Sequence, residues 1–379
     1  MLHTKKFKAR PLLWSLLGGC LMMILSIGFG GNLFAEISSG DLPNEKDVEK
    51  ARRVVINVKN IDTFEYLPGE IGPLPAVPIP ADNPQTRAKI DLGKMLFFDK
   101  RLSGDNSMSC ATCHDPEKGY SDGRKRSIGF GGKELGRHSP TVMNIAYNGA
   151  QFWDGRAGTM EQQAMGPIEA EVEMNLPREE MVIRLNDVPE YKKRFLGVFG
   201  EGPSLENVGR AIAAFERTIV TPNSAFDQYM RGNKQALTKQ EKKGLVLFVS
   251  KAACTQCHNG VNFSDSQFHV LGVPQVGPVK EDLGRFEVTK NEKDKGAFKT
   301  PSLRNVGMSA PYMHDGAFET LDEVVAFYNN GGGVHSNKSP KMMMLNLTKR
   351  ERRDLLAFLK NGLTGQLPIV MAPDLPKAK

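Results

Sequence analysis

Two five-residue segments of this chain repeat one arrangement of cysteines and histidine. Residues 110–114 read Cys-Ala-Thr-Cys-His and residues 254–258 read Cys-Thr-Gln-Cys-His, so both have the form C-x-x-C-H. One helical turn with this pattern presents two thiols to the vinyl carbons of a haem and sets the next imidazole beneath the iron. We therefore predict two covalent haem c groups, attached at Cys110, Cys113, Cys254 and Cys257, with His114 and His258 as proximal iron ligands.

Cysteine usage separates this prediction from two alternatives. Of the five Cys, Cys20 lies in an N-terminal apolar run and the other four form the two segments, which leaves none for a structural disulfide. A thioredoxin-like redox pair and half of a zinc site also use the C-x-x-C spacing. Two copies, each with His directly after the second Cys, favour haem c over both.

Residues 1–35 have the pattern of an export signal. Four basic residues precede an apolar run over residues 12–29, and Ala35 offers a small residue before a cut. An uncleaved anchor is the alternative, because the run approaches the ~20 residues that span a bilayer; the glycines that end the run favour cleavage. Cleavage leaves a formal charge of +3 in place of +7, which does not indicate a nucleic-acid partner. We expect a periplasmic protein without membrane attachment.

Helical patterns dominate the rest of the sequence. Thr86 is expected to begin a helix whose apolar face carries Leu92 and Leu96, and another apolar stripe keeps helical spacing from Leu205 to Ile219. Three further helix starts carry a capping box, in which a Thr and a Glu satisfy each other's backbone donors: Thr238 with Glu241, Thr320 with Glu323, and Thr348 with Glu351. Alternating strand patterns are lacking, so we expect a mainly α fold with long connecting loops.

The spacing of the two haem-attachment segments predicts the domain organisation. They lie 144 positions apart with a helical region between them, which implies two cytochrome c-like domains of one design. We expect a signal peptide (1–35), an extended Pro- and Gly-rich segment or linker (36–85), a first haem domain (86–225) and a second haem domain (226–370).

The residues around both segments resemble the bacterial di-haem cytochrome c peroxidase family. The similar stretches follow the family's order from about Ile90 to Gly365; they are residues 92–99, 102–103, 109–114, 152–157, 214–217, 300–305 and 311–316. The resemblance implies an enzyme that reduces hydrogen peroxide at the first haem. It also implies that electrons come from a small redox protein, such as a cytochrome c or a cupredoxin, through the second haem.

Two positions depart from ordinary members of that family. The first haem is usually closed by a His sixteen residues after the proximal His, where this chain has Phe130, and the second by a Met fourteen residues after His314, where it has Tyr328. Both departures match the MauG-like branch, which implies an open first haem and a Tyr ligand on the second iron. Tyr328 also lies on the apolar stripe of its helix, where an inward hydroxyl needs a partner. A backbone carbonyl or a water is the alternative partner.

The resemblance gives roles to two more residues. Glu173, twenty residues after Trp153, matches the family's distal acid, which would take a proton from peroxide and return it to the departing oxygen. By its residues alone it could equally be a surface Glu in an acidic stretch. Trp153 is implied to relay electrons between the haems, and a core anchor is its other interpretation.

A calcium ion between the domains is a further expectation. The family offers backbone carbonyls at the positions of Ser309 and Pro311, but His138 replaces the Asn that helps to bind calcium, and imidazole is a poor calcium ligand. His138 is therefore expected to have another role, the less favoured one being contact with the first iron. His269 and the Met342–Met344 cluster are interpreted as structural.

Two rival functions follow from the same residues. A MauG-like enzyme would use peroxide to oxidise side chains of a partner protein. A di-haem electron carrier would have both irons closed, and Phe130 argues against it because a phenyl ring cannot coordinate iron.

Overall fold

The chain folds mainly into helices, as its sequence predicts. The computed structural model describes residues 71–377, which lie within one compact unit; the predicted export signal (1–35) and residues 36–70 lie outside the described residues. The α-helices are α2 (Arg87–Phe98), α3 (Cys110–Cys113), α4 (Met160–Glu169), α5 (Arg178–Asn186), α6 (Pro189–Phe199), α7 (Leu205–Glu216), α8 (Ala225–Met230), α9 (Lys239–Val249), α10 (Phe286–Thr289), α11 (Leu321–Asn329) and α12 (Lys349–Ala357).

Short helical turns and one pair of strands join these helices. The turns that matter for the site are η4 (Phe130–Gly132), η6 (Cys254–Gln256), η8 (Val306–Met308) and the π-helical turn η9 (Phe358–Gly362) that continues α12. The strands β1 (Phe268–His269) and β2 (Phe298–Lys299) pair antiparallel. None of the helices within residues 71–377 has the length and apolar character needed to cross a membrane.

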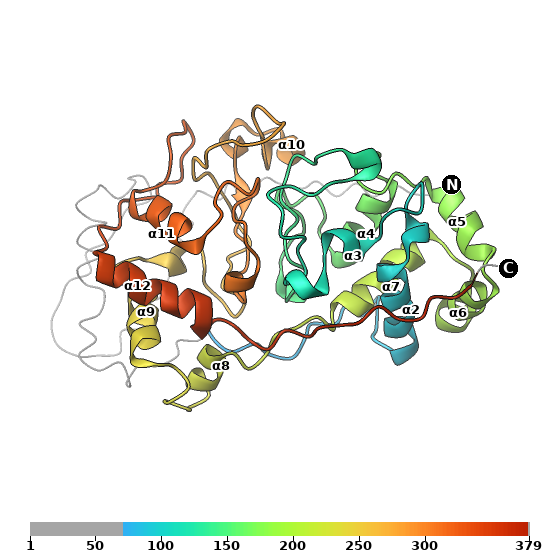
Figure 1. Cartoon of the computed structure of the whole chain (residues 1–379), viewed down its shortest axis with the longest axis horizontal. Helices are drawn as coiled ribbons and strands as arrows, with labels where there is room; N and C mark the ends of the chain where they lie inside the picture. Colours follow the sequence, from blue (N-terminus) through green and yellow to red (C-terminus); the bar gives the residue numbers. More distant parts are fainter. Residues whose placement is uncertain (1–70, 378–379) are drawn as a thin grey trace, which may run out of the picture. The chain divides into compact units, whose positions relative to one another are not determined.

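Helices α2 and α7 cross at the centre of the first lobe, which we define as the hydrophobic core formed between Leu92 and Ile219 (Figure 1). Leu92 and Leu96 of α2 are fully buried there, as the apolar face predicts. The crossing is close because α2 carries Gly93: a Cβ at this position would lie 1.8 Å from the Ala211 carbonyl oxygen of α7. A glycine is therefore required at this contact.

The second lobe, the core formed between Phe226 and Leu363, repeats this arrangement with α9 and α12. A Cβ at Gly244 of α9 would lie 2.1 Å from the Asp354 carbonyl oxygen of α12. Four aromatic rings pack edge to face or tilted beside this crossing; they belong to Phe226, Phe248, Phe263 and Phe358. Each lobe thus places a glycine where its two main helices meet.

The predicted helix starts are confirmed, and one predicted helix end is wrong. Thr86 caps α2, and the three capping boxes begin α9, α11 and α12. Helix α7, however, ends at Glu216, although the apolar spacing continues to Ile219. The chain leaves the helix here because the Ile219 carbonyl accepts a hydrogen bond from the Asn144 backbone N–H and the Thr221 N–H donates to the Asn144 side chain.

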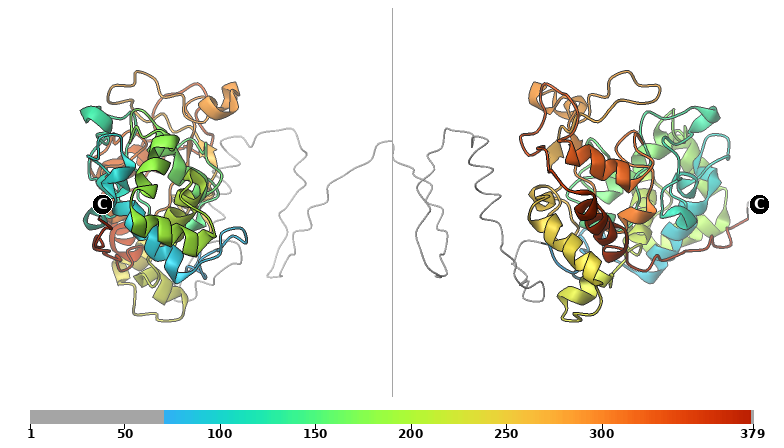
Figure 2. Two further views of the ribbon diagram at one scale, coloured as in Figure 1. Left: turned by 90° about the vertical axis from the view of Figure 1, so that its right-hand side faces the viewer. Right: turned by 60° about the vertical axis from the view of Figure 1, so that its left-hand side comes forward.

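The C-terminal tail connects the second lobe back to the first. After η9 it runs alongside the helices of the first lobe (Figures 1 and 2). Leu367 and Val370 pack against the first core, and the Tyr120 hydroxyl donates to the Pro368 carbonyl oxygen. Residues 248 positions apart therefore help to form the first lobe.

Candidate functional site

The first C-x-x-C-H segment lies in the wall of a cavity in the first lobe. Cys110 and Cys113 begin and end helix α3, and both line this first cavity together with His114. The His114 Nδ1 lies 3.3 Å from the Tyr120 carbonyl oxygen, and burial lowers the pKa of His114. A neutral imidazole that donates from Nδ1 keeps Nε2 available for a metal.

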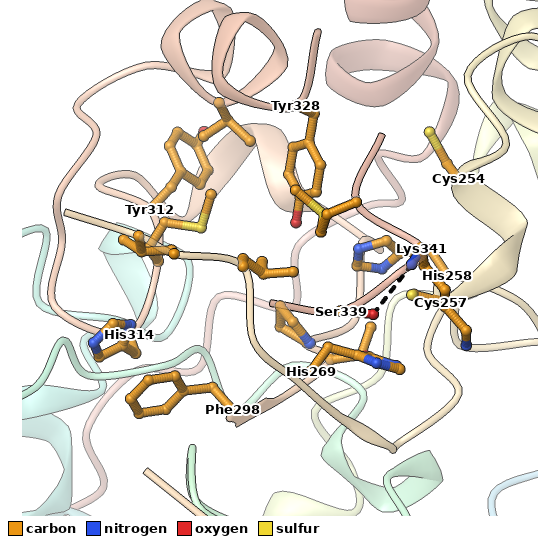
Figure 3. Close-up of a pocket in the computed structure, with 18 of the residues that line it drawn as sticks. Cys254, Cys257, His258, His269, Phe298, Tyr312, His314, Tyr328, Ser339 and Lys341 are labelled. Carbon is orange, nitrogen blue, oxygen red and sulfur yellow. Dashed lines mark hydrogen bonds between the residues drawn. The ribbon is translucent and has the colours of Figure 1, made fainter. Parts of the chain in front are cut away.

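The second segment lines a second cavity in the same way. Cys254, Cys257 and His258 line it from η6 and the residues that follow (Figure 3). The His258 Nδ1 lies 2.9 Å from the Phe263 carbonyl oxygen. Burial lowers the pKa of His258 to about 4, so this imidazole is also neutral and oriented by its backbone contact.

The state of the four thiols argues against a thioredoxin-like site. All four cysteines are free. Burial raises the pKa of Cys113 and Cys257 to about 11 and that of Cys254 to about 12. A redox-active cysteine needs the thiolate at neutral pH, which requires a lowered pKa. These thiols instead line the cavity of each lobe in pairs.

Polar side chains from two further segments line the first cavity. Glu173 lies in the loop after α4, and Arg156 places a guanidinium nitrogen 4.0 Å from its carboxylate. Arg156 is itself held by Asp154 at 2.9 Å and lies over the Phe152 ring. Burial raises the pKa of Glu173, and the Arg156 charge opposes that shift. A carboxyl group in this setting is suited to accept and return a proton.

Phe130 lies beside these residues without lining the cavity. Its backbone N–H donates to the Glu173 carbonyl oxygen at 2.8 Å, and its ring packs at Gly104, where an added Cβ would lie 3.0 Å from the phenyl carbon. Phe130, at the position where the resemblance implies a closing His in ordinary family members, therefore makes its contacts with backbone atoms outside the cavity lining.

Tyr328 lines the second cavity from helix α11. Figure 3 shows its hydroxyl pointing into the cavity, with Cys254 and Cys257 to one side and Tyr312 to the other. Within residues 71–377 the Tyr328 hydroxyl has no hydrogen-bond partner, whereas the Tyr312 hydroxyl donates to the Val306 carbonyl. Burial and the nearby thiols raise the pKa of Tyr328 well above its usual range. The carbonyl considered as an alternative partner is therefore not present.

Trp153 is shared by the two cavities and lines both of them. Its Nε1 donates to the His138 carbonyl oxygen at 2.9 Å, and its own carbonyl accepts from the Lys299 backbone N–H at 2.8 Å. The indole is thus held by the His138 carbonyl and the Trp153 backbone by β2. Glu281 and Asp282 also line both cavities, and Trp153 is the aromatic residue among the three.

The calcium expectation gains no support from His138. Its Nδ1 lies 2.8 Å from the Arg124 carbonyl oxygen and its Nε2 lies 3.5 Å from the Ser121 hydroxyl, so both ring nitrogens face protein atoms. Its backbone N–H donates to the His314 carbonyl in the segment that follows Ser309 and Pro311. Calcium binding by these two carbonyls stays a prediction.

Three of the residues interpreted as structural also line the second cavity. His269 pairs with Asp265 at 2.9 Å, and its ligand atoms lie near the Cys257 thiol, while Met342 and Met343 come from the loop before α12. Sequence reasoning also missed Gln163 and Glu216, which line the first cavity, and Lys299, which lines the second. Glu216 belongs to the family-like stretch 214–217 but was given no role, and no local pattern marks Gln163 or Lys299. Their place in the cavity walls distinguishes all three.

Unpartnered polar atoms test whether the cavities suit a haem. Gln163 Oε1 and Glu216 Oε2 in the first cavity, and His314 Nε2 in the second, are buried without a hydrogen-bond partner in the described part of the chain. Buried polar groups are nearly always paired. Each cavity also has two cysteine thiols and an imidazole oriented by a backbone carbonyl. These groups and the unpartnered polar atoms fit two sites built to hold a haem c.

Comparisons with known proteins give a consistent result. A sequence profile of the di-haem cytochrome c peroxidase family matches residues 87–235. The chain is 42% identical over 320 residues to the cytochrome-c peroxidase IdrP1 of Pseudomonas sp. (strain SCT), with 76% of this chain and 84% of that protein covered. It is 43% identical over 305 residues to the methylamine utilization protein MauG of Methylorubrum extorquens, with 79% and 85% covered.

A solved structure extends this similarity to the fold. The crystal structure of a MauG-like protein associated with microbial copper homeostasis aligns with a TM-score of 0.71 at 34% sequence identity, covering 77% of this chain and 94% of that one.

Proposed function

The chain belongs to the di-haem cytochrome c peroxidase family, and from that premise we propose that it reduces hydrogen peroxide in the first lobe with electrons delivered through the second. Each peroxide takes up two electrons and two protons and gives two waters. The observation that carries this proposal is that the indole of Trp153 lines both cavities, which supports an electron path between them; Glu281 and Asp282 also line both, but neither has an aromatic ring.

Four thiols and two imidazoles would hold the two haems, one in each of two cytochrome c-like domains (86–225 and 226–370). Cys110 and Cys113 with His114 would serve the first cavity, and Cys254 and Cys257 with His258 the second. When bound, the haems supply iron that exchanges electrons and on which peroxide is reduced.

Glu173 is proposed as the proton-transfer residue. Its carboxylate would accept a proton from peroxide and return it to the departing oxygen. Arg156, at 4.0 Å, holds the carboxylate in place and favours its ionised form, while burial favours the protonated form. A group balanced between two such influences can exchange its proton in both directions.

Tyr328 is proposed as the second ligand of the iron in the second cavity. A phenolate in an apolar cavity needs a cation beside it, since burial alone keeps the hydroxyl protonated. Ferric iron would offset that cost. Phe130, which cannot bind metal, leaves the corresponding position of the first haem open.

The remaining proposals concern location and partners. The export-signal pattern of residues 1–35 supports a periplasmic enzyme, and a small cytochrome c or cupredoxin would be its electron donor.

Two experiments test the function. Mass spectrometry of the mature protein should show the added mass of two haems, and a single haem would refute the assignment. Stopped-flow mixing of fully oxidised protein with peroxide should change the Soret band at once, because Phe130 does not close the first haem.

A second candidate function is supported by Phe130 and Tyr328 together. Both match the MauG-like branch, and a MauG protein is among the relatives. In that case the two oxidising equivalents of peroxide would be used on side chains of a partner protein. Peroxide-dependent cross-linking or oxidation of a co-purified periplasmic protein, found by peptide mass spectrometry, would favour this function over reduction of peroxide by a small redox donor.

A further inference from the structure

Lys299 is a buried cation without an anion. It lies on strand β2 and lines the second cavity, and only 7% of the residue is exposed. Its Nζ makes one long contact, 3.4 Å to the Thr300 carbonyl oxygen. Among residues 71–377 no carboxylate oxygen lies within 4.0 Å of this ammonium group; Asp265 acts on it only at longer range.

The other buried cations within residues 71–377 each have a close anion or at least two short hydrogen bonds. Lys89, 6% exposed, donates at 2.8 Å to both the Asn83 side chain and the Pro84 carbonyl. Arg304, 2% exposed, pairs with Asp227 at 3.1 Å and donates to two backbone carbonyls. Arg217, 6% exposed, pairs with Glu161 at 2.7 Å, although its Nη1 has no hydrogen-bond partner. The fold therefore provides partners for buried cations, and Lys299 is an exception that calls for an explanation.

The exception has an energetic consequence. Removing an ammonium group from water is costly unless an anion or several hydrogen bonds replace the water. In the protein alone, burial lowers the pKa of Lys299 to about 8. An anion supplied by the occupant of the second cavity would remove this cost and keep the ammonium charged.

We propose that Lys299 forms an ion pair with a haem propionate in the second cavity. This inference rests on the proposed function, which places a haem there. A haem carries two carboxylates, and Lys299 offers a fixed positive charge inside the cavity wall. The Lys299 backbone N–H donates to the Trp153 carbonyl, so the strand that carries Lys299 is joined directly to a residue that lines both cavities.

Other basic groups at this cavity are less suited to the role. Lys280 and Lys341 are exposed, and Lys341 already contacts Asp265 at 3.7 Å and donates to the Gln256 carbonyl at 2.8 Å. The His314 Nε2 is unpartnered but belongs to a neutral ring stacked on Phe298, so it can donate a hydrogen bond without bringing a charge. Lys299 is the buried, uncommitted charge.

The test compares Lys299→Met with Lys299→Arg in the two-haem protein. Met keeps the apolar stem and removes the charge, so it should lower the midpoint potential of the second haem, because loss of a nearby cation favours ferric over ferrous iron. Lys299→Arg keeps a positive charge at this position, so its second haem should have a midpoint potential close to the wild-type value. The first haem should not shift, and Lys280→Met, the same change at an exposed lysine of the same cavity, should have little effect.

The outcomes separate this inference from the proposed function. The ion pair is overturned if the midpoint potential of the second haem is unchanged in Lys299→Met, or if it shifts by the same amount in Lys299→Arg as in Lys299→Met. In either case a measured mass of two haems would still support the proposed function. Failure of the wild-type protein to carry two haems overturns the proposed function itself. If Lys299→Met does not accumulate, Lys299→Gln provides the same charge removal, and a wild-type potential in that variant likewise overturns the inference.

Discussion

The two lobes are built alike but are lined differently. Each has a C-x-x-C-H segment in a cavity wall, a backbone carbonyl that orients the imidazole, and a glycine where two helices cross. The first cavity is lined by Glu173, Arg156 and Gln163, whereas the second receives the Tyr328 hydroxyl. The two lobes thus share the attachment motif and differ in residues far from it, and the proposed function assigns the chemistry of one lobe and the electron transfer of the other to those residues.

The largest effect is expected from removing the carboxyl group of Glu173, which distinguishes the first lobe from the second. Glu173→Gln should slow the reaction of the oxidised protein with peroxide by about 10²–10⁴-fold, the usual contribution of general acid–base catalysis. Stopped-flow spectroscopy measures the rate. Glu171→Gln, at an exposed neighbour outside the cavity, should leave it unchanged. Equal rates in wild type and Glu173→Gln would show that the first cavity does not rely on this carboxylate.

Tyr328→Phe tests the feature that sets the second lobe apart. The substitution removes the hydroxyl and keeps the ring, so the fold should persist while the second iron becomes high-spin. Tyr328→Met should instead raise the potential of the second haem, since a thioether donates less strongly than a phenolate. Tyr312→Phe is the control, because Tyr312 lines the same cavity but its hydroxyl donates to the Val306 carbonyl oxygen. A wild-type low-spin spectrum in Tyr328→Phe would make Tyr328 an ordinary core residue.

The shared glycine crossings predict similar losses of stability in both lobes. Gly93→Ala and Gly244→Ala should each lower the free energy of unfolding by at least about 1–3 kcal/mol, because the new Cβ would meet a backbone carbonyl that cannot move aside. Gly197→Ala in α6, with open space around it, should be neutral or stabilising by up to about 1 kcal/mol. Chemical denaturation followed by circular dichroism measures all three. If only one of the two substitutions lowers the free energy of unfolding, the two helix crossings are not equivalent and the structural comparison of the lobes is wrong.

Glu216 predicts a pH-dependent effect on stability that belongs to the first lobe. Burial raises the pKa of Glu216 to about 8 from an unfolded value near 4.5, so the folded protein binds the proton more tightly. This contribution to stability is complete below the unfolded pKa and is lost as pH rises through about 8, with a slope of at most about 1.4 kcal/mol per pH unit. Glu216→Gln should flatten the decline in unfolding free energy between pH 5 and 8. If the unfolding free energy of Glu216→Gln falls with pH as steeply as that of the wild type, Glu216 is already ionised in the native protein and this prediction is wrong.

Local patterns in the sequence predicted much of this structure. Thr86, the three capping boxes and both C-x-x-C-H segments act within a few residues of themselves, so their signals are complete in the sequence. The end of α7 was mispredicted because Ile219 stays buried while its carbonyl pairs with Asn144, more than seventy residues away. Lys299 becomes a candidate only when the fold shows that it is buried without an anion, and Gln163 only when its Oε1 is seen to be buried without a hydrogen-bond partner.

The electron paramagnetic resonance spectrum of the fully oxidised holoprotein tests the central difference between the lobes most directly. An open first haem beside Phe130 and a second haem closed by His258 and Tyr328 should give one high-spin and one low-spin ferric signal in equal amounts. Two low-spin signals would contradict this account, because both irons would then be closed and the protein would be an electron carrier.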